Sequence, residues 1–178
     1  VGYTAAGSAA EGSAIDFLVD TLRAERDVTL VTLGPLTNVA LALAGAPDIV
    51  PSVERCVVMG GAACTVGNVT PAAEYNVWAD PDAARQVFHS GLPIEMVGWE
   101  LCRGPATLDA DDRAYVAGFD TELARFALDC NRTALIASQR QSGEPGLDLP
   151  DPVAMSIALD PKLAIRTSRC YVAVETDS

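Results

Sequence analysis

Apolar residues follow two different spacings along the chain. Some recur at i, i+3, i+4 and i+7, as on one face of an amphipathic helix, and others form short β-branched runs typical of buried strands. The helical spacing and its stop signals predict helices over residues 13–26, 35–45, 81–90, 119–140 and 151–159. The short apolar runs predict strands over residues 28–33, 56–59, 93–98 and 171–174.

The order of these elements predicts an α/β fold with an open, mainly parallel sheet and helices on both faces. The 178 residues are enough for one domain with its own core, and we expect a single α/β domain over residues 1–178. The chain begins at Val1 rather than Met and ends at Ser178, soon after the last predicted strand. We therefore expect both ends to be cut from a longer protein.

Composition narrows the partners that the chain can have. Lys and Arg number 12 against 24 Asp and Glu, a net charge of −12, and no basic cluster interrupts this excess. Such a chain is a poor binder of nucleic acid or of anionic membranes, and no apolar stretch is long enough to cross a bilayer. The five cysteines include no CxxC pair, which indicates a reduced, intracellular protein without a zinc site. The single histidine, His89, is expected on the surface near a helix end.

One polar loop contains the first candidate site residues. It follows the predicted strand 56–59 and precedes the helix 81–90, where α/β proteins place their ligands. The loop contains Asn68, Glu74 and Asn76, and two amides with one acid suit a neutral, hydroxyl-rich ligand better than a phosphate. Glu74 and Asn76 are two residues apart, so on extended backbone they point to one side. The alternative is a structural turn with Glu74 solvated.

Three aspartates precede a proline: Asp80, Asp151 and Asp160. Each is explained as a helix cap or boundary, because an acid satisfies free N–H groups at a helix start. Asp151 differs because the Gly/Pro loop 141–150 leads into it, and an acid there suits a hard cation such as Ca²⁺. One carboxylate is not a metal site by itself. The acidic stretch 107–112 lacks EF-hand spacing and predicts a capped helix start.

Several blocks together resemble the inosine-uridine-preferring nucleoside hydrolases. They are TLVTLGPLTNVALAL, VVMGG, GNVTPAAEYNVWADPDAA, IEMVG and DPVAMSIALDP, in family order and across nearly the whole chain. The resemblance implies an enzyme that hydrolyses the N-glycosidic bond of ribonucleosides to free base and ribose. It also implies an open parallel α/β sheet and one Ca²⁺ in the pocket.

The resemblance assigns roles to individual residues. Asn68 and Glu74 match positions that bind the ribose, chiefly toward its 5′ side. Asn76 matches the amide that holds the sugar near the reacting centre. Asp151 matches an acid that binds calcium and the ribose diol, and the main-chain carbonyl of Leu33 matches a second calcium ligand.

Two further positions, Met59 and Tyr75, match residues that line the sugar and base pocket. In the implied mechanism the base departs from an oxocarbenium-like ribose, whose positive charge the acid and amides stabilise. Calcium positions and acidifies the attacking water. Asn76 and Asp151 are the expected catalytic residues.

The chain departs from the family pattern in two places. The N-terminal DxDxxxDD motif, which supplies most calcium carboxylates and the base that activates water, is absent before Ser13. We therefore expect an internal fragment that is inactive by itself. Pro150 occupies the position where many members carry a His that protonates the leaving base, so purine or pyrimidine preference stays open.

The remaining expectations follow from the same resemblance. The partner is a small-molecule ribonucleoside, the setting is cytoplasmic purine or pyrimidine salvage, and the full-length protein is expected to form a dimer or tetramer. The alternative to an enzyme is a non-catalytic homologue that binds a nucleoside or ribose.

Overall fold

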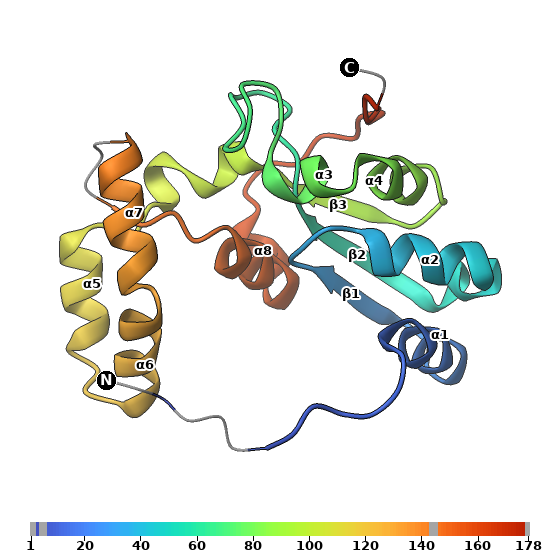
Figure 1. Ribbon diagram of the computed structural model, residues 1–178, viewed down its shortest axis with the longest axis horizontal. Coiled ribbons are helices and arrows are strands. Elements are labelled where there is room, and N and C mark those ends of the chain that lie inside the picture. Colours follow the sequence, from blue (N-terminus) through green and yellow to red (C-terminus); the bar gives the residue numbers. More distant parts are fainter. Residues whose placement is uncertain (1–2, 4–6, 143–145, 177–178) are drawn as a thin grey trace. The chain divides into compact units, whose positions relative to one another are not determined.

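A computed structural model describes residues 3, 7–142 and 146–176. Contacts divide the chain into two compact units, which we call the sheet unit (residues 10–101 and 150–178) and the helical unit (residues 1–9 and 102–149). The strands of the sheet unit are β1 (Val28–Thr32), β2 (Val53–Met59) and β3 (Ile94–Val97) (Figure 1). Its helices are α1 (Ala14–Ala24), α2 (Thr37–Gly45), α3 (Tyr75–Ala79), α4 (Pro81–Phe88) and α8 (Pro150–Leu159). It also contains the 3₁₀ turns η1 (Pro47–Ser52) and η4 (Pro161–Leu163). The helical unit contains α5 (Ala110–Ala117), α6 (Glu122–Cys130), α7 (Arg132–Ser142) and the turn η3 (Gly104–Ala106), and the turn η2 (Trp99–Cys102) ends at its boundary.

The sheet has three parallel strands in the order β1-β2-β3. Its middle strand is buried continuously from Cys56 to Met59, because helices cover both faces. Cys56 and Val58 belong to the core beneath α1, α2 and α4. Since side chains alternate along a strand, Val57 and Met59 point to the other face, where α8 packs against β1 and β2. These observations confirm the predicted α/β fold.

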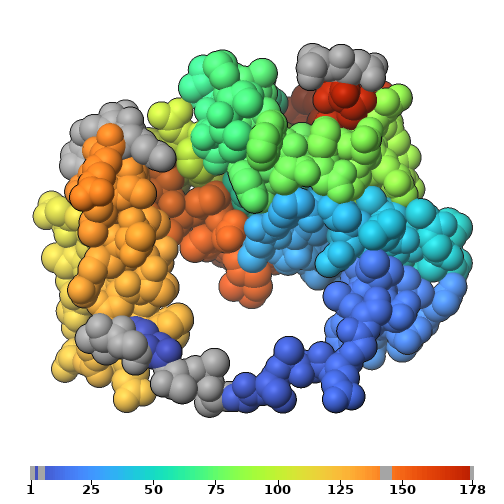
Figure 2. Space-filling model, in the orientation of Figure 1, coloured from blue at the N-terminus to red at the C-terminus, as the bar shows by residue number. Residues whose placement is uncertain are grey.

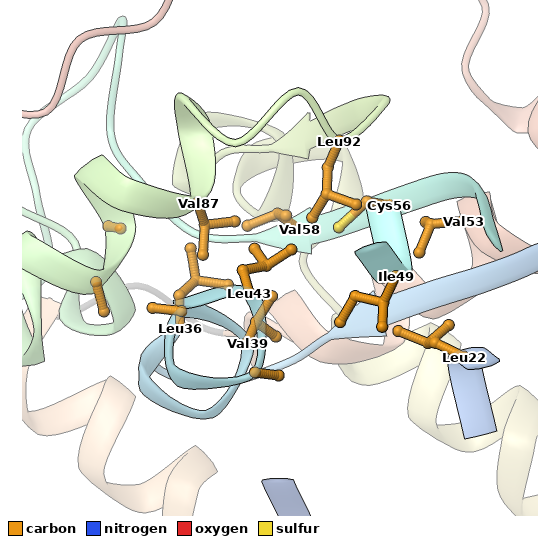
Figure 3. Packing of buried hydrophobic residues seen from close by; sticks show 14 of the residues in the cluster. Leu22, Leu36, Val39, Leu43, Ile49, Val53, Cys56, Val58, Val87 and Leu92 are labelled. Carbon is orange, nitrogen blue, oxygen red and sulfur yellow. The ribbon is translucent and has the colours of Figure 1, made fainter. Parts of the chain in front are cut away.

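The core of the sheet unit is built from small and medium aliphatic side chains (Figure 3). Helix α2 contributes several buried residues, since it packs against α1, α4 and η1. The labelled members come from α1, the α2 region, η1, β2, α4 and the segment before β3: Leu22, Leu36, Val39, Leu43, Ile49, Val53, Cys56, Val58, Val87 and Leu92. This packing places the carboxyl ends of all three strands at one edge.

Most predicted helices are confirmed, but the long helix predicted over residues 119–140 is wrong. Helix α6 ends at Cys130, and α7 begins at Arg132. The Asn131 side chain donates to the Ala127 carbonyl at 2.9 Å, which competes with the helical hydrogen-bond pattern. The apolar spacing continued through this break and therefore gave no sign of it.

The strand predicted over residues 171–174 is also wrong, because this segment has no regular secondary structure. The Tyr171 hydroxyl and His89 Nε2 lie 2.8 Å apart, and Val174 packs against the core. An apolar run has the composition of a strand, but a strand forms only beside a partner. His89 is exposed at the end of α4, as predicted.

Two smaller expectations can also be compared with the structure. Asp109 is the N-cap of α5 in a reciprocal capping box with Asp112, which confirms the helix start predicted for the acidic stretch. Residues 143–145 of the predicted loop 141–150 lie outside the described residues. No helix in the described part of the chain has the length and apolar character that crossing a membrane requires.

Candidate functional site

The candidate site lies where the parallel strands end. Thr32 at the end of β1 pairs with Val58, and Met59 at the end of β2 pairs with Val97 of β3. The Gly60 N–H then donates to the Val97 carbonyl at 3.2 Å, so the chain leaves the sheet from its middle strand. The loop that follows, residues 60–74, projects from the surface of the sheet unit (Figures 1 and 2).

Glu74 closes this loop back onto the end of β2. Its side chain is only 2% exposed and is the N-cap of α3. Oε1 accepts the Asn76 N–H at 2.9 Å. Oε2 accepts the N–H groups of Gly61 at 2.9 Å and Val77 at 3.3 Å. Three backbone N–H donors therefore satisfy both oxygens of this buried carboxyl group without a cationic side chain.

The backbone around Glu74 differs from the extended form expected from the sequence. Glu74 itself is extended, but helix α3 begins at Tyr75, so Asn76 lies in a first helical turn. The two side chains are brought together by capping and not by strand alternation. The prediction that they lie close was based on the wrong local geometry.

Asn76 is fixed by the strand end as well. Its Nδ2 donates to the Met59 carbonyl at 3.1 Å and lies 3.2 Å from Met59 Sδ, and the residue is 9% exposed. With Nδ2 held in this way, Oδ1 points away from the Met59 carbonyl. Asn76 therefore offers an oriented acceptor beside the Glu74 carboxylate.

Asn68 reaches the same short helix from the other side of the loop. Its Oδ1 accepts the Tyr75 N–H at 2.9 Å. The turn before it needs glycine, because a Cβ on Gly67 would lie 1.9 Å from the Ala73 carbonyl oxygen. The Tyr75 side chain is exposed, whereas the Met59 side chain is buried beneath the strand end. The two residues predicted to line a pocket thus have very different solvent access.

Asp151 comes from a distant part of the sequence. It lies in the first turn of α8, immediately after Pro150. Burial raises the pKa of its carboxyl group, and the negative charge of Glu74 raises this pKa further. The two acids are therefore close enough to interact electrostatically, which brings Asp151 to the region of Glu74 and Asn76.

Oxygen donors at this edge suit a hard cation but are few. Leu33 is the first residue after β1, so its main-chain carbonyl belongs to the same strand-end edge. The Asp151 carboxyl group is the second donor, and burial raises its pKa because the surroundings disfavour its charged form. In the part of the chain that the structure describes, no three His, Cys, Asp or Glu side chains cluster as a metal site. Oxygen donors of this kind suit hard cations in general, and these two residues supply only part of the ligands that such a cation binds.

Gly61, the second of two glycines after β2, supports the candidate site directly. A Cβ on Gly60 would lie 3.5 Å from Glu74 Oε2, and Gly61 has φ +82° and donates its N–H to the same oxygen. Gly61 is a site residue that sequence reasoning missed. The signal was the Gly-Gly pair directly after a strand, which also fits ordinary packing.

A separate groove of about 750 Å³ lies elsewhere in the sheet unit. Its walls come from α2, η1 and α4, and it contains none of the predicted site residues. The groove and the candidate site are therefore different parts of the sheet unit.

Comparison with known proteins supplies independent findings. A model of the inosine-uridine preferring nucleoside hydrolase family matches residues 3–178. Pyrimidine-specific ribonucleoside hydrolase RihA of Shewanella baltica is 37% identical over 168 residues, which cover 93% of this chain and 52% of that protein.

Solved structures agree with these matches. A plant nucleoside hydrolase superposes with a TM-score of 0.84 at 28% identity over 89% of this chain and 50% of its own. A purine-preferring ribonucleoside hydrolase from Gardnerella vaginalis gives 0.78 at 34% identity over 88% of this chain and 50% of its own. The chain thus spans about half the length of these relatives.

Proposed function

The chain belongs to the inosine-uridine preferring nucleoside hydrolase family, and on this premise we propose that the whole protein hydrolyses the N-glycosidic bond of ribonucleosides to free base and ribose. The observation that carries the proposal is the meeting of two acids and an oriented amide at one sheet edge. Glu74 and Asn76 are buried and fixed by backbone groups, and Asp151 lies within the electric field of Glu74.

The charges at this edge suit cleavage through an oxocarbenium-like ribose. As the bond to the base breaks, positive charge develops on the sugar ring. Glu74 and Asp151 provide negative charge in a partly desolvated setting, where electrostatic stabilisation is stronger than in water. Because Glu74 is held by three N–H groups, it does not need to reorient during the reaction.

The neutral side chains would position the sugar. Asn76 presents Oδ1 to a ribose hydroxyl while Nδ2 stays on the Met59 carbonyl. Asn68 and Glu74 are proposed to bind the 5′ side of the ribose. Tyr75, which is exposed, would contact the base, and Met59 would pack beneath the sugar.

We propose Ca²⁺ as the cofactor, held in this chain by the Asp151 carboxylate and the Leu33 carbonyl. When bound, calcium would orient the 2′ and 3′ hydroxyls of ribose and acidify a water molecule. Calcium takes about six to eight oxygen ligands, so further ligands must complete the site. Asp151 contributes by holding negative charge beside the sugar at the start of α8.

The base preference of the protein is open to direct measurement. Pro150 has no proton to donate to a leaving base. The relatives include both a pyrimidine-specific and a purine-preferring hydrolase at similar identity. Both inosine and uridine are therefore needed as substrates in any assay.

The decisive test is ribose release from inosine and uridine by the full-length protein, with and without a chelator. We expect release that falls on chelation and recovers when Ca²⁺ is restored. No release from either nucleoside with calcium present would falsify hydrolase activity on those substrates. Ribose binding without release, measured by calorimetry, would instead indicate the non-catalytic homologue.

We also propose a cytoplasmic setting in nucleoside salvage and a homo-oligomeric full-length protein. The support for a reducing compartment is that no disulfide joins the five cysteines, all of which lie in the described part of the chain. Size-exclusion chromatography with light scattering tests the oligomeric state.

A further inference from the structure

The guanidinium group of Arg55 joins three elements of the sheet unit. Its Nε and Nη2 donate to the two carboxylate oxygens of Glu95 on β3, each at 2.8 Å. Its Nη1 donates to the Ala158 carbonyl at 3.1 Å, and Nη2 also approaches the Ile157 carbonyl at 3.4 Å. Arg55 itself belongs to β2, so one side chain connects both strands with the last turn of α8.

The end of α8 needs such a donor. The last carbonyls of a helix have no partner within the helix. The residue four positions after Ile157 is Pro161, which has no N–H to offer. A cation is also favoured at the negative end of the helix dipole. Glu95 holds the planar guanidinium in a bidentate pair, which directs its remaining N–H groups at these carbonyls.

Arg55 binds carbonyls in the last turn of α8, and Asp151 lies in the first turn of the same helix. Asp151, Ala154 and Ala158 follow the i, i+3, i+7 spacing, and Ala154 is fully buried against the sheet. The helix rises about 10 Å between Asp151 and Ala158. On β2, the path from Arg55 to Met59 covers about 13 Å. The two spans are similar, so fixing the helix end at Arg55 places Asp151 close to the end of β2.

Helix α8 needs this anchor for a physical reason. Its fully buried residue is Ala154, a side chain too small to lock the helix into a groove, so packing alone resists sliding weakly. Directed hydrogen bonds from Arg55 to the carbonyls at the far end oppose this sliding.

We propose that Arg55, oriented by Glu95, is a positioning residue that sets the place of α8 along β2 and thereby the place of Asp151 beside Glu74 and Asn76. This inference rests on the proposed function, since its consequence is catalytic. Arg55 touches neither the sugar-binding residues nor the reacting atoms and acts through α8.

The experiment compares Arg55→Met with Arg23→Met in the full-length protein. Arg23 makes a similar bidentate pair with Asp48 at 2.8 and 3.0 Å, but it joins α1 to η1 and does not contact α8. We expect Arg55→Met to lower kcat by about 10- to 100-fold with KM changed less than about 3-fold, because a misplacement near 1 Å is costly. Arg23→Met should keep kcat within about 2-fold.

A conservative variant separates positioning from general stability. Arg55→Lys keeps the positive charge but loses the planar, bidentate guanidinium geometry. Its kcat should therefore lie between those of Arg55→Met and the parent protein. Equal kcat in Arg55→Met and Arg23→Met would overturn the inference, as would a loss seen only in KM.

Hydrogen exchange distinguishes failure of the inference from failure of the proposed function. If the parent protein hydrolyses neither nucleoside, the proposed function fails on those substrates and exchange decides the role of Arg55. Faster exchange of the α8 amides in Arg55→Met, but not in Arg23→Met, supports the anchor. Unchanged α8 exchange in both variants overturns it.

Discussion

The two acids of the candidate site are held in opposite ways. Glu74 is enclosed by its own segment: backbone N–H groups from Asn76, Val77 and the nearby Gly61 occupy its oxygens. Asp151 is held by the docking of a whole helix, and burial together with the charge of Glu74 raises its pKa. Local structure supplies hydrogen-bond donors to the Glu74 oxygens, whereas tertiary structure disfavours the charged form of Asp151.

This difference separates an acid that supports the fold as well as the proposed chemistry from an acid that supports the proposed chemistry alone. A buried acid that accepts three N–H bonds is part of the architecture of its loop. An acid placed next to a like charge without compensating donors costs stability, which is typical of functional sites. Substitutions at the two positions should therefore separate stability from activity.

The largest expected effect is on activity in Asp151→Asn. The substitution keeps the shape of the side chain and removes its charge, so kcat/KM for ribose release should fall by ~10³-fold. The free energy of unfolding should not fall, because a repelled charge is removed. The proposed contrast between Glu74 and Asp151 would be contradicted if Asp151→Asn unfolded more easily than the parent protein and kept its activity.

The second-largest expected effect is a lower free energy of unfolding in Glu74→Gln. The amide NH₂ of glutamine faces backbone donors, so an N–H of the loop loses its acceptor and the capping charge is gone. We expect a decrease of about 2 kcal/mol in the free energy of unfolding, measured by urea denaturation.

A matched control for this measurement is Glu54→Gln, since Glu54 is exposed on β2. Its effect should stay within about 0.5 kcal/mol. Equal stability of both variants would show that the three N–H bonds to Glu74 contribute nothing measurable.

Asn76→Ala is expected to show a mixed effect. Losing the hydrogen bond to the Met59 carbonyl should cost about 1 kcal/mol of stability. If the Asn76 contact with the sugar strengthens as charge develops, kcat should fall more than KM rises. Steady-state kinetics with inosine and uridine measures the split, and a change in KM alone would contradict the role of Asn76 in the transition state.

The smallest effect is a pH dependence of stability caused by Asp151. Its pKa is raised in the folded state, so the folded protein retains a proton that the unfolded chain has already lost. Stability contributed by this group is therefore lost as pH rises from about 4 through the folded pKa.

Measuring the free energy of unfolding against pH in both the parent protein and Asp151→Asn isolates this effect. The pKa values of Asp80 and Glu95 are lowered in the folded state, by the hydrogen bonds from Thr37 and Arg55 first, so their stabilisation is lost as pH falls. Both groups are present in parent and variant and cancel in the difference. The stability gain of Asp151→Asn should be larger at about pH 7 than at about pH 4, and the opposite order would contradict the raised pKa.

Local sequence signals predicted much of the fold and part of the site. Asp80 caps α4 with Pro81 at its first position, as the pattern indicated, since capping depends on neighbours along the chain. The break at Asn131 and the irregular segment around Tyr171 were missed. Each depends on a competing hydrogen bond or on a partner that local spacing does not encode.

By itself, the sequence determined the alternation of strands and helices, the glycine pair after β2 and the residue types of the polar loop. These follow from interactions between near neighbours, such as backbone capping and the alternation of side chains along a strand. Only the tertiary structure decided that Asp151 lies in the field of Glu74 and that Arg55 holds the far end of its helix. Contacts between segments distant in the chain arise from packing of the whole sheet unit, which local patterns leave open.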